Sequence, residues 1–190
     1  MKVTLLKIQR QGILKQLEGN SNLGLELGVA EGVFSRRAIA SGKFKKYIGI
    51  DMYSDRGHDL SQYKKALSCV GIFSEYSLLK MRFDEALDLF EDNSLDFIYV
   101  DGYAHTGEEN GQTFYDWWPK LKPGGMFAGD DYDKKKWPLV YNNVNKFCED
   151  KDIKELFVTG IVENNTWSRY PTWMAWKPQA LVACDRTRKS

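Results

Sequence analysis

Three aspartates follow two apolar runs of the sequence, and their side chains could hold a divalent cation. Asp101 comes directly after the run from Leu95 to Val100, and Asp130 and Asp131 come directly after the run from Gly125 to Gly129. If the two runs are neighbouring parallel strands, their ends lie about 5 Å apart and the carboxylates converge. Clustered carboxylates repel one another unless cations or protons offset them, and Mg²⁺ takes oxygen ligands at about 2.0–2.1 Å. The sequence therefore predicts a metal site here, and the alternative is that Asp130 and Asp131 cap a turn while Asp101 faces water.

A histidine close to these aspartates is the candidate for proton transfer. His105 lies just after Asp101 and just before an expected helix. An imidazole with a pKa near neutrality can remove a proton from a substrate hydroxyl. We therefore assign His105 as the candidate general base and Asp101 as a second candidate catalytic residue. The alternative for His105 is a solvated loop histidine. The other histidine, His58, is expected to face solvent.

Glycines and acidic residues nearer the start of the sequence indicate a nucleoside site. Glu26, Gly28 and Gly32 form an acidic-x-Gly-x-x-x-Gly pattern where a strand is expected to give way to a helix. Glycine lets the backbone approach a ligand closely, and a helix N-terminus can hold a carboxylate. Asp51 follows the next apolar run, where a carboxylate can accept hydrogen bonds from both hydroxyls of a ribose. This segment lacks the dinucleotide pattern Gly-x-Gly-x-x-Gly, and Asp51 alone does not tell one nucleoside from another.

Alternating apolar runs and amphipathic stretches must position these residues. The pattern predicts strands at residues 23–28, 47–51, 73–79, 95–100 and 125–129, helices at 32–41, 60–69, 83–90, 108–118 and 137–149, and two final strands at 155–162 and 171–176. Such alternation predicts an α/β fold with a Rossmann-like, seven-stranded, mostly parallel sheet and helices on both faces. No helix separates the last two strands, so we expect an antiparallel C-terminal hairpin at one edge. Ligands of such sheets bind beyond the carboxyl ends of the strands.

Length and composition are those of one globular domain. The 190 residues are 43% hydrophobic and 28% charged, which is enough to bury a substantial core. We predict a single domain over residues 1–190, with an N-terminal helical extension at 1–20 and a basic tail at 185–190. The net charge of +1 gives no electrostatic case for nucleic acid or a membrane surface as a partner.

Cysteine usage and the absence of long apolar runs predict a cytoplasmic location. The three cysteines, Cys69, Cys148 and Cys184, are odd in number and widely spaced, which argues against a disulfide framework or a zinc site. No apolar run of the sequence is long enough to span a bilayer, and no secretory signal is visible.

The segment from Leu95 to Tyr132 reads as one unit with a recognisable pattern. It contains an apolar strand, Asp-Gly, a nearby His, Trp-Trp-Pro, a Leu-Lys-Pro-Gly-Gly turn and Gly-Asp-Asp-Tyr. This combination resembles the class I S-adenosylmethionine (SAM)-dependent methyltransferases, in particular the subfamily that includes metal-dependent O-methyltransferases of antibiotic sugars. The resemblance runs from about Leu23 to Tyr132 and, in outline, through the C-terminal hairpin.

The resemblance implies a cofactor site and a metal site. We expect SAM to contact Glu26, Gly28, Gly32, Asp51, Met52, Met81, Arg82 and Asp101. The metal-ligand positions of the sugar methyltransferases match Asp101, Asp130 and Asp131, which implies Mg²⁺. Those enzymes carry a second aspartate two residues after the first ligand as their proposed base, whereas this sequence has Tyr103 there, and His105 is displaced by one residue from its usual spacing.

Together these features lead to a hypothesis of methyl transfer from SAM to a small-molecule hydroxyl, such as that of a sugar or another vicinal diol. A metal held by the three aspartates would lower the pKa of the hydroxyl, and His105 would remove its proton. One alternative is an NAD-dependent oxidoreductase on a similar sheet, and another is a non-catalytic nucleoside-binding module of the same fold. A homodimer through an exposed sheet edge also stays open.

Overall fold

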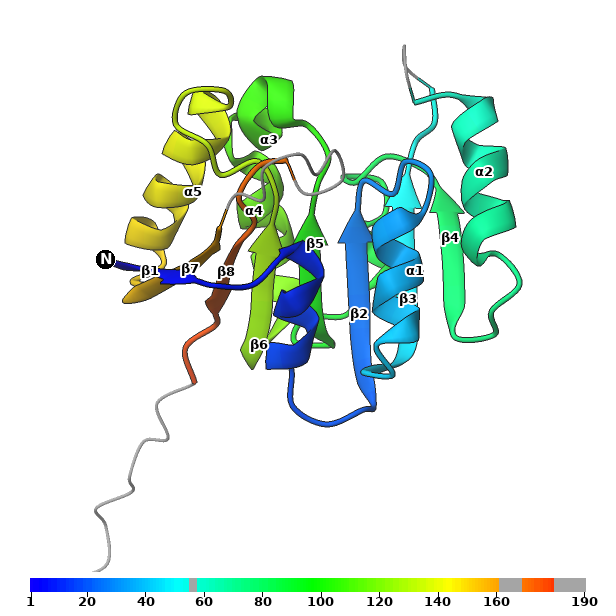
Figure 1. Cartoon of the computed structure of the whole chain (residues 1–190), viewed down its shortest axis with the longest axis horizontal. Helices are drawn as coiled ribbons and strands as arrows, with labels where there is room; N and C mark the ends of the chain where they lie inside the picture. Colours follow the sequence, from blue (N-terminus) through cyan, green and yellow to red (C-terminus); the bar gives the residue numbers. More distant parts are fainter. Residues whose placement is uncertain (55–57, 161–168, 180–190) are drawn as a thin grey trace, which may run out of the picture.

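A mixed β-sheet forms the centre of the computed structural model, which describes residues 1–54, 58–160 and 169–179 (Figure 1). Within these residues the sheet has eight strands in the order β1-β7-β8-β6-β5-β2-β3-β4. Neighbouring strands run parallel except at β8, which is antiparallel to both β6 and β7. The elements in chain order are β1 (Lys2–Leu6), η1 (Arg10–Gln16), β2 (Asn22–Leu27), α1 (Val33–Ala40), β3 (Phe44–Asp51), α2 (Leu60–Val70), β4 (Tyr76–Lys80), η2 (Leu87–Leu89), β5 (Leu95–Val100), η3 (Ala104–Thr106), α3 (Gly107–Asn110), α4 (Gln112–Trp117), η4 (Trp118–Lys120), β6 (Leu121–Gly129), α5 (Pro138–Asp150), β7 (Glu155–Thr159) and β8 (Trp173–Trp176).

The order of the strands reverses between β2 and β5. From β2 the chain moves outward through β3 to β4 and then returns to β5, on the other side of β2. In open α/β sheets, the crevice at such a reversal is where ligands bind, beyond the carboxyl ends of the strands. Gly28 follows β2 and Asp101 follows β5, so both stand at this reversal, and the Asp101 backbone N–H donates to the Leu27 carbonyl at 2.8 Å.

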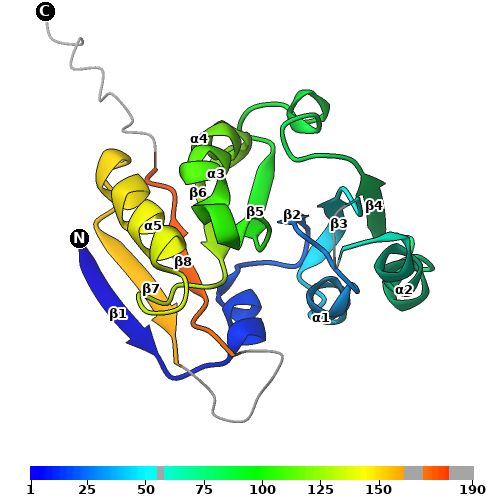
Figure 2. The same ribbon diagram turned by 90° about the horizontal axis from the view of Figure 1, so that it is seen from above.

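Two apolar layers cover the two faces of the sheet. On one face, α4 and α5 bury aromatic side chains that include Phe114, Trp117 and Phe147 against the strands. On the other face, Ile13 of η1 and Phe34 of α1 pack against side chains from β3, β5 and β6. Figure 2 shows η1, α1 and α2 on one side of the sheet and α4 and α5 on the other. The expected α/β fold with helices on both faces is therefore confirmed.

The N-terminal segment differs from the predicted helical extension. Residues Lys2–Leu6 form β1, which pairs in parallel with β7, and only residues Arg10–Gln16 are helical, as a 3-10 helix. Val3 and Thr4 are β-branched and suit a strand better than a helix. This strand makes the described sheet eight-stranded instead of seven-stranded. The hairpin of β7 and β8 is present, but β1 lies outside it, so the hairpin is not at the edge of the sheet.

Two of the expected helices are shorter than the sequence pattern predicts. Residues 83–90 contain only the single turn η2, and residues 108–118 are divided into α3 and α4 at Gly111, which has a φ of +86°. None of the helices in the described ranges combines the length and the apolar character that crossing a bilayer requires. The predicted basic tail at 185–190 and Cys184 lie outside the described residues.

The carboxyl group of Glu26 in β2 is buried beneath α1. Glu26 is 1% exposed, and its Oε2 accepts a hydrogen bond from the Ser35 hydroxyl at 2.7 Å. The Ser35 hydroxyl in turn lies 3.0 Å from the Tyr76 hydroxyl. Burial raises the pKa of Glu26 to about 8; the Ser35 hydrogen bond lowers it, and the charges of Asp101 and Asp51 raise it. Glu26 is therefore protonated at neutral pH.

We predict that Glu26 makes the protein less stable as the pH rises from about 4.5 to about 8. In this window the folded chain keeps a proton that the unfolded chain releases, so the free energy of unfolding falls by up to about 1.4 kcal/mol per pH unit. Glu26→Gln keeps a hydrogen-bond acceptor for Ser35 and removes the titration. Urea unfolding between pH 5 and 9 should show a steeper decline for the natural chain than for Glu26→Gln.

The exposed Glu91 provides the matched control for this measurement. Glu91→Gln should decline with pH as steeply as the natural chain does. Parallel stability curves for the natural chain and Glu26→Gln would show that Glu26 is ionised in the folded protein.

Candidate functional site

A pocket lies at the carboxyl ends of β2, β3 and β5, at the point where the strand order reverses. It is lined by Gly28, Ala30, Asp51, Met52, His58, Phe83, Asp101, Gly102 and Tyr103. The cavity volume is only about 50 Å³, so its walls lie close together. One wall is formed by the Phe83 ring, which packs on Gly102 and lies 4.8 Å from the Tyr103 ring, centroid to centroid.

Gly28 allows two loops of this pocket to touch. Its φ is +92°, and a Cβ atom built on it would lie 2.0 Å from the backbone oxygen of Asp101. Any larger residue would therefore both strain the backbone and push the Asp101 loop away. Gly28 thus sets the position of Asp101 relative to the end of β2.

Asp51 holds the glycine-containing loop in place. Its Oδ2 accepts hydrogen bonds from the backbone N–H groups of Val29 and Ala30, each at 3.0 Å. Its Oδ1 accepts from the Tyr53 N–H at 3.0 Å. An ionised carboxylate has about four lone-pair positions, so these three donors leave room for a further one.

The pocket contains half of the residues that were expected to contact SAM. Gly28, Asp51, Met52 and Asp101 line it. The other four lie elsewhere: Glu26 is buried under α1, Gly32 packs against α2, Met81 packs on the core, and Arg82 forms an ion pair with Asp84.

Five residues that line the pocket were not among the expected contacts of SAM: Ala30, His58, Phe83, Gly102 and Tyr103. Phe83 belongs to an apolar pattern that suggested a core helix, and Tyr103 stood out only as a departure from a family pattern. His58 was expected to face solvent, and it is an exposed residue, but it lines the pocket. The position of Phe83 just after β4 is the one signal that could have placed it at the carboxyl edge of the sheet.

The predicted cluster of aspartates contains a cation that comes from the protein itself. Arg10, the first residue of η1, reaches the ends of β5 and β6. Its Nη1 lies 3.1 Å from Asp101 Oδ2, and its Nη2 forms an ion pair with Asp130 Oδ2. The second oxygen of Asp130 accepts a hydrogen bond from the Thr172 hydroxyl at 2.9 Å. The countercharge that the sequence assigned to Mg²⁺ is therefore supplied by a guanidinium.

These contacts do not fit the predicted metal site, and we correct that prediction. Asp130 has both oxygens committed to protein donors, and one oxygen of Asp101 faces Arg10. In the ranges 1–54, 58–160 and 169–179, no three acidic, histidine or cysteine side chains are grouped so that they could hold a metal ion. The sequence pattern located the cluster correctly but gave no indication of Arg10, which lies about 90 residues upstream of Asp101.

Acidic groups around Arg10 have raised pKa values. Burial raises the pKa of Asp131 to about 7; the charge of Asp101 adds to this, and Arg10 opposes it. Burial also raises the pKa of Glu108 to about 8, although the Tyr103 N–H donates to its Oε2 at 3.0 Å. Asp131 and Glu108 are therefore the acidic groups near Arg10 whose raised pKa values allow proton exchange near neutral pH.

The structure does not place His105 in the pocket. It is an exposed residue of η3, and its ring lies edge-on to the Trp137 ring at 5.0 Å between centroids. Its assignment as a general base stays a prediction. Glu108, which the sequence analysis treated only as the start of a helix, is buried close to Asp101 and Asp131.

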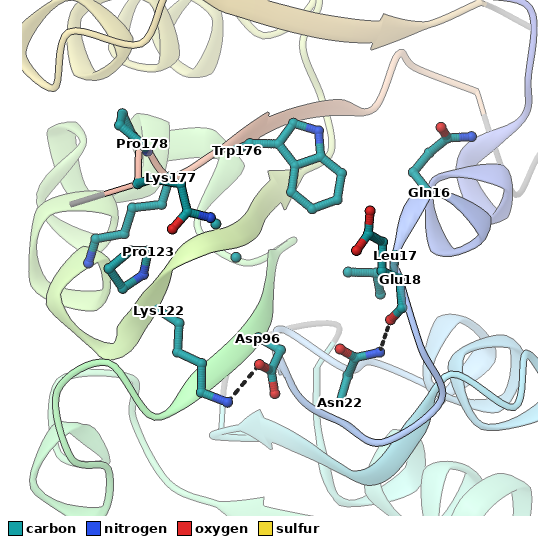
Figure 3. Close-up of a pocket in the computed structure, with 13 residues that line it drawn as sticks. Gln16, Leu17, Glu18, Asn22, Asp96, Lys122, Pro123, Trp176, Lys177 and Pro178 are labelled. Carbon is teal, nitrogen blue, oxygen red and sulfur yellow. Dashed lines mark hydrogen bonds and ion pairs between the residues drawn. The ribbon is translucent and has the colours of Figure 1, made fainter. Parts of the chain in front are cut away.

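A larger pocket lies at the amino ends of the strands, whereas Asp101, Asp130 and Asp131 follow the carboxyl ends. Figure 3 shows side chains that line this larger pocket. Its cavity volume is about 550 Å³, and its lining includes Glu18, Asp96, Lys122 and Trp176. Lys122 forms an ion pair with Asp96 at 2.6 Å. Because this pocket lies at the amino ends of β2, β5 and β6, it is not where a parallel sheet binds its cofactor.

Comparisons with known proteins identify a family for the segment that contains the pocket at Gly28 and Asp101. Residues 25–132 match the model of a methyltransferase-domain family. Comparison with curated proteins gives no significant match.

Solved structures with a similar fold include three enzymes of low sequence identity. Spermidine synthase from Thermotoga maritima has a TM-score of 0.65 at 17% identity, over 90% of this chain and 62% of that one. The N-methyltransferase NodS from Bradyrhizobium japonicum has a TM-score of 0.63 at 17% identity, over 90% and 95% of the two chains. A SAM-dependent O-methyltransferase from Thermotoga maritima has a TM-score of 0.63 at 15% identity, over 94% and 65%.

The matched segment contains every residue that lines the pocket, together with Asp130 and Asp131. The chain spans less than two thirds of the spermidine synthase and of the O-methyltransferase, so these similarities describe its fold. The family match covers more than half of the chain. The chain therefore belongs to the methyltransferase-domain family.

Proposed function

We propose that the protein transfers the methyl group of SAM to a hydroxyl of a small polar molecule, such as a sugar or another vicinal diol. The observation that supports this most directly is the position of Asp101. It lines the cofactor pocket, and it also belongs to the charged group formed with Arg10, Asp130 and Asp131. An acceptor beside Asp131 would therefore lie next to the cofactor.

The pocket has the polar and apolar groups that the nucleoside part of SAM requires. The remaining lone pair of Asp51 can accept a ribose hydroxyl, and Met52, Phe83 and Tyr103 offer apolar surface to a base. Ligand pockets have volumes of about 300–1,000 Å³. The pocket must therefore widen when the cofactor binds. When bound, SAM supplies a methyl group that is activated by a positively charged sulfur.

Asp131 is the proposed general base. The acceptor oxygen forms a bond to the methyl carbon while the carbon–sulfur bond breaks, and the proton of the hydroxyl passes to Asp131. A base with a pKa near the working pH is the most effective one. The raised pKa of Asp131 and its position near Asp101, whose charge contributes to that pKa, support this role.

An amine acceptor is the second candidate. Arg10 is the one guanidinium that pairs with Asp101 and Asp130 in the described structure, and Asp131 adds a third carboxyl group. The remaining negative charge would attract an ammonium group, which Asp131 could then deprotonate. Methyl-acceptor assays that compare diols with primary amines separate the two candidates.

We predict that Gly28→Ala weakens SAM binding at least tenfold and destabilises the fold. The new Cβ would collide with the Asp101 backbone, in addition to straining a residue with a positive φ. Gly42→Ala is the matched control, because Gly42 has a φ of +66° and open space around it. It should cost about 1–2 kcal/mol of stability and leave the SAM dissociation constant unchanged. Calorimetric titration with SAM measures the dissociation constants of the two variants. Equal affinities of Gly28→Ala and Gly42→Ala for SAM would contradict the cofactor site.

We predict that Asp131→Asn lowers the methyl-transfer rate by about 10²-fold or more without weakening SAM binding. In the natural enzyme the rate should rise with pH up to about 7, because the base acts only when it is ionised, and then level off. The variant should lose this rise.

Asp133→Asn is the control for this experiment. Asp133 lies on the same loop, and its carboxylate accepts the N–H groups of Lys135 and Lys136, which an asparagine oxygen can also do. Its rate should stay within a few-fold of the natural one. If Asp131→Asn were as active as Asp133→Asn, Asp131 would not be the base.

A further inference from the structure

Arg10 is an unusual partner for the aspartates because it comes from outside the part of the chain that matches the methyltransferase family. The match covers residues 25–132, whereas Arg10 begins η1. Its side chain is only 11% exposed, and that of its partner Asp130 is 3% exposed. A buried charge is costly unless it is paired, so this pair specifies one position for the guanidinium.

The elements on both sides of Arg10 are fixed by packing. After Arg10, Ile13 and Leu14 of η1 are 0% and 1% exposed and belong to the core under α1 and β3. Before it, β1 is paired with β7 over five residues. Arg10 is therefore held toward the ends of β5 and β6 by structure on either side of it.

The guanidinium lies where a divalent cation would have to bind. A metal ion at this position needs the oxygens of Asp101 and Asp130 that face Arg10. The planar guanidinium already pairs with both, and its positive charge offsets part of their repulsion. Burial lowers the pKa of Arg10, but the nearby Tyr99, Asp101 and Asp131 raise it further, so the group stays charged.

We propose that Arg10 takes the place of a divalent metal in this site, so that the protein holds Asp101 and Asp130 with its own cation and excludes Mg²⁺ and Mn²⁺. The exclusion of divalent cations by Arg10 does not depend on which reaction the protein catalyses. If the proposed function also holds, Arg10 is a positioning residue that fixes the acceptor side of Asp101, and methyl transfer proceeds without added metal.

The test is a titration of the full chain with Mn²⁺, followed by electron paramagnetic resonance of the free ion and by thermal unfolding. The natural chain should bind no stoichiometric Mn²⁺. Arg10→Met keeps much of the apolar stem and removes the charge, and it should bind one Mn²⁺ per chain at least tenfold more tightly than the control Lys15→Met does. Lys15 lies on the same helix but is exposed, so the control changes the net charge equally.

A double variant and a refolding measurement complete the test. The double variant Arg10→Met/Asp130→Asn should lose the Mn²⁺ site, which would locate it. If Arg10→Met is recovered unfolded, it is refolded with and without Mn²⁺: folding restored by the ion supports the proposal, and failure in both conditions counts against it. The proposal is overturned if the natural chain binds Mn²⁺ as tightly as Arg10→Met, or if folded Arg10→Met binds it no better than Lys15→Met.

The reaction is measured separately so that the two proposals can fail independently. Suppose that Mn²⁺ binding follows the expected pattern but no methyl group is transferred to any diol or amine. The Arg10 inference would then hold, and the proposed function would be wrong. Methyl transfer that is abolished by a chelator and restored by Mg²⁺ would overturn the Arg10 inference and leave the reaction in place.

Discussion

The repulsion between carboxylates at the ends of β5 and β6 is the constraint on which the site depends. Parallel strands in register bring Asp101 and Asp130 to one edge of the sheet, since Val100 pairs with Gly129 directly before them. Asp130 is buried and Asp101 is partly buried, and two negative charges that lie close together in such surroundings are stable only with a cation or a proton. The protein uses both solutions: Arg10 pairs with Asp101 and Asp130, and the raised pKa values of Asp131 and Glu108 mark groups that hold a proton easily.

The same edge of the sheet supports the cofactor pocket through backbone contacts. Gly28 touches the Asp101 backbone. Asp51 accepts hydrogen bonds from backbone N–H groups of the loop that follows Gly28. The ends of β2, β3 and β5 are therefore linked through the backbone of Gly28 and through the Asp51 carboxylate. A change at Asp51 would alter the glycine loop and, through Gly28, the position of Asp101.

The sequence predicted the elements whose periodicity is local and missed the contacts that join distant segments. The run from Leu95 to Val100 is a strand as expected, and Asp101 and Asp130 lie against the same guanidinium at the ends of β5 and β6. β1 was missed because a short edge strand with exposed Val3 and Leu5 has no clear alternation. Arg10 was missed because nothing in residues 1–20 indicates which distant carboxylates will face it. The expected metal was a correct inference about charge, but a side chain from another part of the chain provided that charge.

The pairing of β1 with β7 also has a consequence for the order in which the enzyme becomes complete. Lys2 and Glu155, which face each other across this pair, are 153 positions apart. During synthesis the ribosome releases β1 long before β7, so the segment that carries Arg10 has no strand to dock against until most of the chain has emerged. The half of the sheet from β2 to β5 contains its own neighbouring strands and can assemble earlier. A nascent chain should therefore form the pocket at Gly28 and Asp51 before Arg10 reaches Asp101 and Asp130.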